Sequence, residues 1–178
     1  MLPQPLHPAV VHFPVVLVVL LPVVALVAVL AIRRGVGVRG AWLPVVAVSA
    51  GLTVASWAAV ETGEREEEAV ERVVSRDAFH EHEDRAKLFL PLTVIGLVVV
   101  SAGLLAGKPG EVIRAAAVVT GVGLAIVGYM VGHSGGELVY EHGAAAAYVQ
   151  PNTISGAGPV DGGERHEDEG EGPERDRR

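Results

Sequence analysis

The sequence predicts an all-α integral membrane protein: a four-helix bundle with a helical polar extension before its third helix and a disordered acidic C-terminal tail. Half of the 178 residues are hydrophobic, and charged residues are absent from four runs, at 1–32, 40–60, 88–107 and 115–132. A helix of roughly 20 apolar residues, rising about 1.5 Å per residue, crosses a hydrocarbon core of about 30 Å. These runs predict four spans within a membrane domain of residues 1–143, at about 10–32, 41–60, 88–107 and 113–133.

The first span is expected to be a retained helix rather than a secretory signal. It lacks a positively charged leading region, and its uncharged run is longer than the apolar core of about 7–15 residues in a signal peptide. Arg33 and Arg34 follow it directly, as basic residues do at the end of a membrane anchor.

The last three spans carry small residues at helical spacing. Small side chains let backbones approach closely, and close packing drives helix association in lipid. The pattern therefore predicts a compact bundle. The residues are Ala47, Gly51, Ala55 and Ala59 in the second span, Gly103 and Gly107 in the third, and Ala117, Gly121, Ala125, Gly128 and Gly132 in the fourth.

The polar connection at 61–87 is expected to be helical, because apolar residues recur in it at helical spacing. If the third helix begins before the membrane, His82 lies on its partner-facing stripe. The glycines around Gly135 and Gly136 predict that the chain leaves the fourth span in a tight path and folds over the bundle end. Residues 144–178 are expected to form a disordered tail, since 161–178 holds eight acids and four arginines.

Composition excludes several classes of function. The chain has no cysteine, which excludes disulfides, thiolate zinc sites, iron–sulfur clusters and covalent c-type haem attachment within it. The net charge of −7 leaves no basic footprint for nucleic acid. No hydrolase motif is present and no catalytic residue is assigned, so we expect an electron-transfer or metal-binding protein rather than an enzyme.

Six histidines fall on one side of the predicted bundle. His7 and His12 open the first span, His80 and His82 lie between the second and third, and His133 and His142 follow the fourth. An even number of crossings separates each pair from the next, so all six share one membrane face. Imidazole is a common ligand of transition metals and of haem iron. The pattern predicts a metal or haem site at that face.

The predicted ligands of a b-type haem are His12, His82, His133 and His142. For a bare copper or zinc ion, His7 joins the same four. Pro8 disfavours helix at His7, which we therefore expect in an extended entry segment. Glu61, Glu137 and Tyr140 are the predicted supporting residues around the ligands. A third alternative is a structural membrane subunit without a cofactor, whose histidines only cap helix ends.

The two end motifs, LHPAVVHFP and GHSGGELVYEHG, resemble those of a family of bacterial membrane proteins called domain of unknown function 2231. The resemblance covers about residues 6–143. In some relatives a similar domain is joined to Rieske-type or cytochrome-like redox domains, which implies a respiratory role and a redox partner protein. The matching residues are His7, Pro8, His12, Pro14, Gly135, Gly136, Leu138, Tyr140, His142 and Gly143.

The expected location is the bacterial cytoplasmic membrane, with several spans and with both termini on one side. The loop at 33–40 packs three arginines into eight residues. The positive-inside rule is strongest for short loops near span ends, which favours this loop as cytoplasmic and the histidines as outside. The expected partners are the lipid bilayer and a redox protein, without nucleic acid; a homodimer is compatible with this interpretation.

Overall fold

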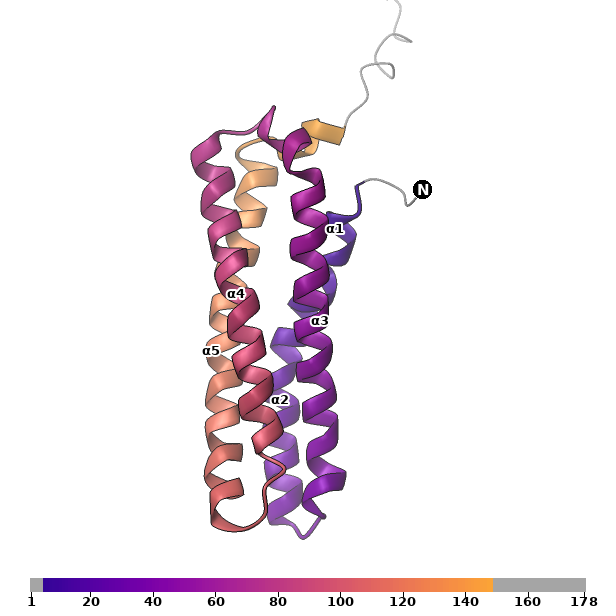
Figure 1. Cartoon of the computed structure of the whole chain (residues 1–178), viewed down its shortest axis with the longest axis vertical. Helices are drawn as coiled ribbons and strands as arrows, with labels where there is room; N and C mark the ends of the chain where they lie inside the picture. The colour runs from indigo at the N-terminus through magenta and orange to yellow at the C-terminus, as the bar shows by residue number, and fades with distance from the viewer. Residues whose placement is uncertain (1–4, 149–178) are drawn as a thin grey trace, which may run out of the picture. The chain divides into compact units, whose positions relative to one another are not determined.

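The uncharged runs form long helices in the computed structural model, which describes residues 5–148 (Figure 1). The elements in order are α1 (His7–Val10), α2 (His12–Arg33), α3 (Val38–Glu71), α4 (Arg76–Ala102), α5 (Gly107–Tyr140) and the 3-10 helix η1 (Ala144–Tyr148). Four helical segments of the described chain, the first running from α1 through α2, are long and apolar enough to cross a membrane. The predicted all-α membrane fold is confirmed.

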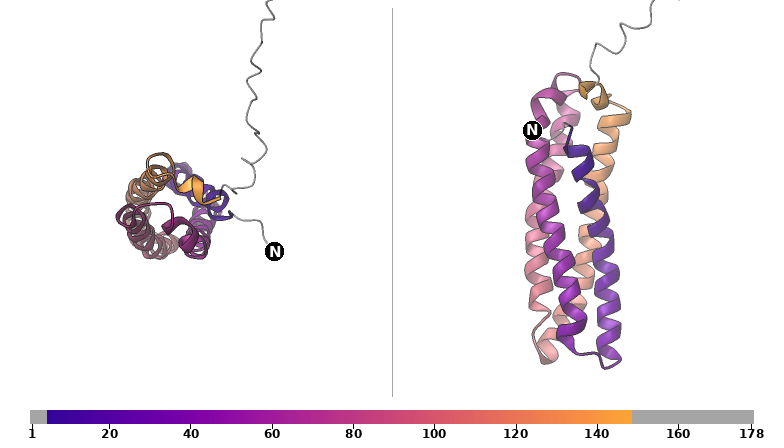
Figure 2. Two further views of the ribbon diagram at one scale, coloured as in Figure 1. Left: turned by 90° about the horizontal axis from the view of Figure 1, so that it is seen from above. Right: turned by 90° about the vertical axis from the view of Figure 1, so that its right-hand side faces the viewer.

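Each long helix packs against two neighbours, in the order α2, α3, α4, α5 and back to α2 (Figures 1 and 2). Successive helices run antiparallel and are joined by short connections, as in an up-down-up-down bundle. The chain therefore returns after α5 to the end from which it started. We call this end, which carries α1, the α3–α4 connection and η1, the histidine end, and the opposite one the arginine end.

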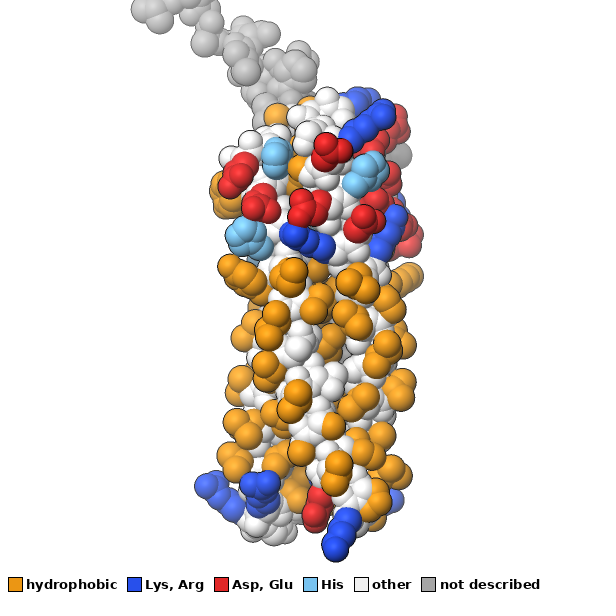
Figure 3. Space-filling view, turned by 90° about the vertical axis from the view of Figure 1, so that its left-hand side faces the viewer, with side chains coloured by type: hydrophobic (Ala, Val, Ile, Leu, Met, Phe, Trp, Pro, Cys, Tyr) orange, Lys and Arg blue, Asp and Glu red, His pale blue; other side chains and the backbone are white. Residues whose placement is uncertain are grey.

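The surface of the bundle is apolar along its middle, as lipid exposure requires. Leu21, Trp42 and Leu52 are fully buried in the core, whereas Val98 and Val119 on the outside are 65% and 72% exposed. Figure 3 shows an apolar belt between one end rich in acids and histidines and another that carries Lys and Arg. An exposed apolar surface of this extent is typical of contact with a bilayer.

Glycines bring the helices into close contact, as the small-residue pattern predicts. A Cβ atom on Gly121 would lie 3.3 Å from the Pro22 backbone of α2, and one on Gly128 would lie 3.1 Å from Val18. At Gly103 the space is filled by the Trp42 indole, whose Nε1–H donates a 2.8 Å hydrogen bond to the Val100 carbonyl. Gly132 has open space instead, so this part of the predicted stripe makes no such contact.

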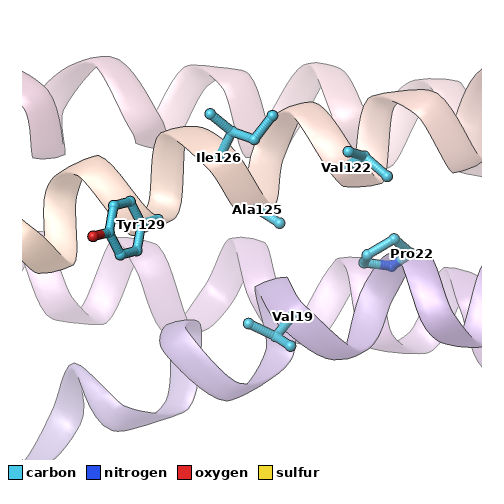
Figure 4. A pocket seen from close by; sticks show the side chains of 6 residues that line it. All are labelled: Val19, Pro22, Val122, Ala125, Ile126 and Tyr129. Carbon is cyan, nitrogen blue, oxygen red and sulfur yellow. The ribbon is translucent and has the colours of Figure 1, made fainter.

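An open apolar groove runs between α2 and α5 in the belt (Figure 4). It forms where Pro22 packs against the small residues of α5. Its lining side chains are Val19, Pro22, Val122, Ala125, Ile126 and Tyr129. Several of them, including Val19 and Ile126, are exposed on the lipid-facing surface of the bundle.

The helices extend beyond the apolar belt at the histidine end. α3 continues to Glu71 and α4 begins at Arg76, which confirms the helical polar extension. The tight path expected at Gly135 and Gly136 is wrong, because α5 continues through both glycines to Tyr140. The turn comes at Gly143, where φ is +72°, a conformation that favours glycine. Of the tail predicted from residue 144, the first five residues form η1, and 149–178 lie outside the described residues.

The arginine end is closed by a buried guanidinium. Arg114 of α5 is 5% exposed. Its Nη1 donates hydrogen bonds to the carbonyls of Gly103 and Leu105, at 2.7 and 3.2 Å. A cation at the C-terminus of α4 satisfies free carbonyls and interacts favourably with the helix dipole. The contact fixes the short α4–α5 connection against the bundle.

Candidate functional site

His7 begins α1 and points into the bundle, so the extended segment predicted for it is wrong. Pro8 occupies the first turn of the helix, where its missing N–H has no helical acceptor to lose. The His7 backbone N–H donates to Oε1 of Glu66 at 3.1 Å, and the preceding N–H, of Leu6, donates to the same oxygen at 2.6 Å. This carboxylate replaces the usual side-chain cap and places the start of α1 against α3.

The His7 imidazole is held by oxygens of α3. Its Nδ1 lies 2.9 Å from the carbonyl of Ala59 and 3.4 Å from Oγ1 of Thr62. A carbonyl can only accept, so Nδ1 carries the hydrogen in the neutral ring. The Nε2 atom of His7 then keeps its lone pair, since a neutral imidazole has one donor and one acceptor nitrogen.

The His82 imidazole is held by α5 in the same way. Its Nδ1 lies 3.1 Å from Oγ of Ser134, and that hydroxyl donates its hydrogen to the carbonyl of Val131 at 3.0 Å. Because the Ser134 hydrogen is used there, Oγ accepts from Nδ1–H of His82. The lone pair of His82 again lies on Nε2. Two histidines from remote parts of the chain thus share one tautomer.

The two rings meet at the histidine end of the bundle. Their centroids lie 6.4 Å apart and their planes are 79° from parallel, an edge-to-face arrangement. Glycines on the neighbouring helices make room for both rings. A Cβ on Gly63 would lie 3.2 Å from Cε1 of His7, and a Cβ on Gly135 would lie 3.0 Å from Cε1 of His82. We call His7 and His82 the histidine pair.

Burial favours the neutral form of His82. The ring lies beyond the charge-free run that starts at Leu88, between α4 and α5, and is half-buried. Burial lowers the pKa of His82 below its usual value of 6.5, and the neighbouring His7 lowers this pKa further. A neutral imidazole is the form that binds a metal.

Glu66 connects three segments of the chain at this end. It is 7% exposed, on the inner face of α3 beyond the apolar belt. Its Oε1 accepts from the backbone of Leu6 and His7, and its Oε2 accepts a 2.6 Å hydrogen bond from the Tyr148 hydroxyl. Burial works against ionisation, but these hydrogen bonds outweigh it and hold the pKa of Glu66 below its usual value.

Tyr148 lies in η1, which packs against both α3 and α5. Burial, together with the Glu66 carboxylate, raises the pKa of the Tyr148 hydroxyl well above its usual value. The phenol therefore stays a donor to Glu66. A small apolar cluster of Val74, Leu138 and Ala144 lies between η1, α5 and the α3–α4 connection.

The remaining predicted ligands have exposed side chains. His12, His133 and His142 are all exposed, and so is His80, which lies 3.4 Å from Glu83. The His133 ring lies against Tyr129, with centroids 5.8 Å apart. Of the four histidines predicted as haem ligands, His82 belongs to the histidine pair. Its partner His7 was predicted as a ligand only for a bare copper or zinc ion. Within residues 5–148, no three His, Asp or Glu side chains come together closely enough to hold a metal ion.

The predicted supporting residues lie elsewhere on the surface of this end. Glu61 pairs with Arg65 at 2.8 Å, Glu137 lies 3.4 Å from His133, and Tyr140 is 89% exposed. The hydrogen-bonding residues around the pair were not predicted from sequence: Ala59, Thr62, Glu66, Ser134 and Tyr148. Helical spacing could have indicated that Glu66 lies on the inner face, because Ala59, Gly63 and Glu66 follow one another at steps of four and three residues along α3.

Comparison with protein families identifies one match. A family model described as a predicted membrane protein (DUF2231) covers residues 3–147. Comparisons with curated proteins and with solved structures gave no match. The matched range contains the whole bundle together with nearly all of η1.

Proposed function

Since the chain belongs to the DUF2231 family of predicted membrane proteins, we propose that it binds a b-type haem at the histidine pair and transfers electrons at one membrane face. The observation that carries this proposal is the meeting of two imidazoles, from α1 and α4, with both Nε2 lone pairs free of hydrogen bonds among the described residues. A haem iron needs only one or two axial ligands from the protein, and histidine is a usual one.

The two rings lie close enough together to serve one bound group. The centroids of His7 and His82 are 6.4 Å apart, and the ring planes are 79° from parallel. If a haem bound at this end of the bundle, His7 and His82 would be the residues that hold its iron.

The hydrogen bonds of the two Nδ1 atoms support the same proposal. Ligating histidines almost always donate the other ring N–H to an oxygen, which fixes the tautomer and the ring orientation. The Ala59 carbonyl does this for His7, and Ser134 Oγ does it for His82. When bound, the haem supplies one-electron redox chemistry. The chain's own residues orient both imidazoles and partly shield them from water.

The layout of the chain favours electron exchange at only one face of the membrane. The histidine pair lies at one end of the bundle, and the other end carries the loop with Arg33, Arg34 and Arg39. Because short arginine-rich loops stay cytoplasmic, we propose that the histidine end and both chain termini face outward. A redox protein on that side is the proposed partner.

A visible absorption spectrum tests the haem assignment. The full chain, purified in detergent from cells supplied with haem precursor, is expected to show a Soret band that shifts on reduction. His7→Ala and His82→Ala should each weaken or shift the band, and the double variant should abolish it. His133→Ala is the matched control, because its ring is exposed on α5 and should leave the band unchanged.

Two results would overturn the assignment. One is a colourless protein after haem supplementation, whether it carries copper, zinc or no metal. The other is a Soret band that survives the His7→Ala, His82→Ala double variant. Circular dichroism and size-exclusion profiles of each variant separate loss of haem from loss of fold.

A further inference from the structure

Three buried hydroxyl groups and the half-buried Thr53 lie on α3 and α4 in the membrane part of the bundle, apart from the histidine pair. Ser49, Thr53 and Ser56 follow one another along α3, and the backbone carbonyl of Thr93 on α4 accepts a hydrogen bond from Thr53. Ser49, Ser56 and Thr93 are 1%, 3% and 1% exposed. Their neighbours on the same buried stripe of α3 are apolar, with Val45 and Leu52 fully buried.

The two threonines use their hydrogens on backbone carbonyls. Thr53 Oγ1 shares its single hydrogen between the carbonyls of Ser49 and Thr93, at 3.1 and 3.2 Å, and so joins α3 to α4. Thr93 Oγ1 donates to the Leu90 carbonyl at 2.7 Å. Each hydroxyl keeps its acceptor lone pairs, since a hydroxyl has one hydrogen and two lone pairs. The seam between the helices is therefore rich in acceptors.

The two serines have no partner at all among the described residues. Ser49 Oγ and Ser56 Oγ are fully buried and make no hydrogen bond there. A hydroxyl in a helix can bond to the carbonyl four residues earlier, as Thr62 does to Ala58 at 2.8 Å. An unpaired buried hydroxyl is unfavourable, because it has lost its hydrogen bonds to water and gained none in the protein. Two such groups on one helix face point to a ligand that pairs with both.

Water fits this seam better than a cation does. The available groups are neutral hydroxyls and carbonyls, and no acid lies on α3 between Val38 and Val60 or on α4 from Leu88 onward. A cation held without a carboxylate at this depth would remain an uncompensated charge. Water donates and accepts, so it can satisfy the orphaned serines and the acceptor lone pairs of the threonines together.

The hydroxyls extend from the histidine end towards the bilayer centre. Ser56 lies three residues before Ala59, whose carbonyl accepts from His7, which is about 4.5 Å along the helix axis. Ser49 lies about 15 Å from Ala59 along the same axis. Beyond Ser49 the core becomes dry, where Val45 and Val100 are fully buried and Trp42 fills the space against Gly103.

We propose that Ser49, Thr53, Ser56 and Thr93 bind a file of internal water between α3 and α4, hydrated from the histidine end and closed at Trp42. The file is independent of the proposed haem, because the rings of His7 and His82 are hydrogen-bonded to Ala59, Thr62 and Ser134 and to none of these four residues. The file brings water to the side of the histidine pair that faces the bilayer centre, without opening a path across the membrane.

Radiolytic hydroxyl labelling of the full chain in detergent or lipid tests the file. Radiation generates hydroxyl radicals from bound water, and these oxidise only adjacent side chains. Leu52, fully buried between Ser49 and Ser56, should be oxidised well above background. Trp42 is equally buried and intrinsically more reactive, yet should stay unlabelled because it lies in the dry part. The Ser49→Ala, Ser56→Ala double variant should reduce Leu52 labelling several-fold.

Ser101→Ala is the matched control, since it removes a hydroxyl from α4 near the arginine end and should leave Leu52 labelling unchanged. The proposal is overturned if Leu52 is as inert as Trp42, or if its labelling survives the double variant. An experimental structure in which both serines bond to the carbonyls four residues earlier, without water beside them, would also overturn it. Bound sodium or potassium that is lost in the double variant would assign the hydroxyls to a cation instead.

Discussion

The Tyr148 hydroxyl donates a 2.6 Å hydrogen bond to Glu66, whose other oxygen holds the backbone of Leu6 and His7. One carboxylate therefore ties the segment after the last helix and the segment before the first one to the middle of the chain. The histidine pair depends on this junction, because α1 presents the His7 ring only while its first turn stays on α3.

Tyr148→Phe should destabilise the histidine end without unfolding the bundle. Hydrogen bonds to charged groups contribute about 1.5–3 kcal/mol, and the substitution removes the phenol donor while keeping its ring. The free energy of local opening, measured by hydrogen exchange of η1 and the end of α5, should fall by about this amount. Tyr140→Phe is the control, since that side chain is 89% exposed; an equal effect in both variants would contradict the assigned contact.

Glu66→Ala should release α1 from α3. The backbone N–H groups of Leu6 and His7 lose their acceptor. A loss of about 1.4 kcal/mol in the free energy of local opening corresponds to a tenfold change in the opening equilibrium. Hydrogen exchange at these two amides should therefore accelerate by roughly tenfold or more. Glu67→Ala, one position along the same helix, should leave their exchange rates unchanged. Unchanged protection in Glu66→Ala would mean that the carboxylate does not hold α1.

The Tyr148–Glu66 contact should be most stable between mildly acidic and mildly alkaline pH. The folded-state pKa of Glu66 is lowered, so its contribution is present above the usual value of 4.5 and is lost as the pH falls through the folded pKa. The folded-state pKa of Tyr148 is raised, so its contribution is present below the usual value of 10.0 and is lost as the pH rises through the folded pKa.

Hydrogen exchange of η1, corrected for the intrinsic pH dependence of exchange, measures this stability profile. The near-ultraviolet absorbance of phenolate adds a direct observation, since a high-pH ionisation step should disappear in Tyr148→Phe. A profile that is the same in the wild-type chain and in Tyr148→Phe would exclude this contact as its source.

Gly135→Ala and Gly136→Ala should have different effects, although the two residues are neighbours in α5. A Cβ at 135 would lie 3.0 Å from Cε1 of His82, so the ring must move, whereas a Cβ at 136 meets nothing within 4 Å. In a helix interior alanine is favoured over glycine by roughly 0.5–1 kcal/mol. Gly136→Ala should therefore raise the stability of the end of α5, measured by hydrogen exchange.

Gly135→Ala should instead shift the imidazole resonances of His82 in nitrogen-15 spectra, because the Nδ1 contact with Ser134 is disturbed. Gly136→Ala should leave these resonances in place. Identical spectra for both glycine variants would show that Gly135 does not position the ring.

Much of the fold follows from local sequence patterns. Each span is set by the absence of charge over a stretch long enough to cross the bilayer, and the helical connection follows from apolar spacing within one segment. Both depend on a residue's near neighbours, so the four long apolar helices and the helical connection were predicted correctly. The local rule failed at His7 and at Gly135 and Gly136. At His7, distant Glu66 anchors the helix start; at Gly135, the glycine accommodates the ring of His82 instead of making a turn.

The sequence by itself determined that the chain crosses a membrane in four helices and that six histidines fall at one end, because hydrophobicity and helix parity are properties of the linear chain. Only the tertiary structure decided that His7 meets His82, that Glu66 joins the two chain ends and that two serines are left unpaired. Those outcomes depend on the rotation of each helix about its own axis. Adjacent residues such as His133 and Ser134 lie about 100° apart on a helix, so one faces outward while the other holds the ring of His82.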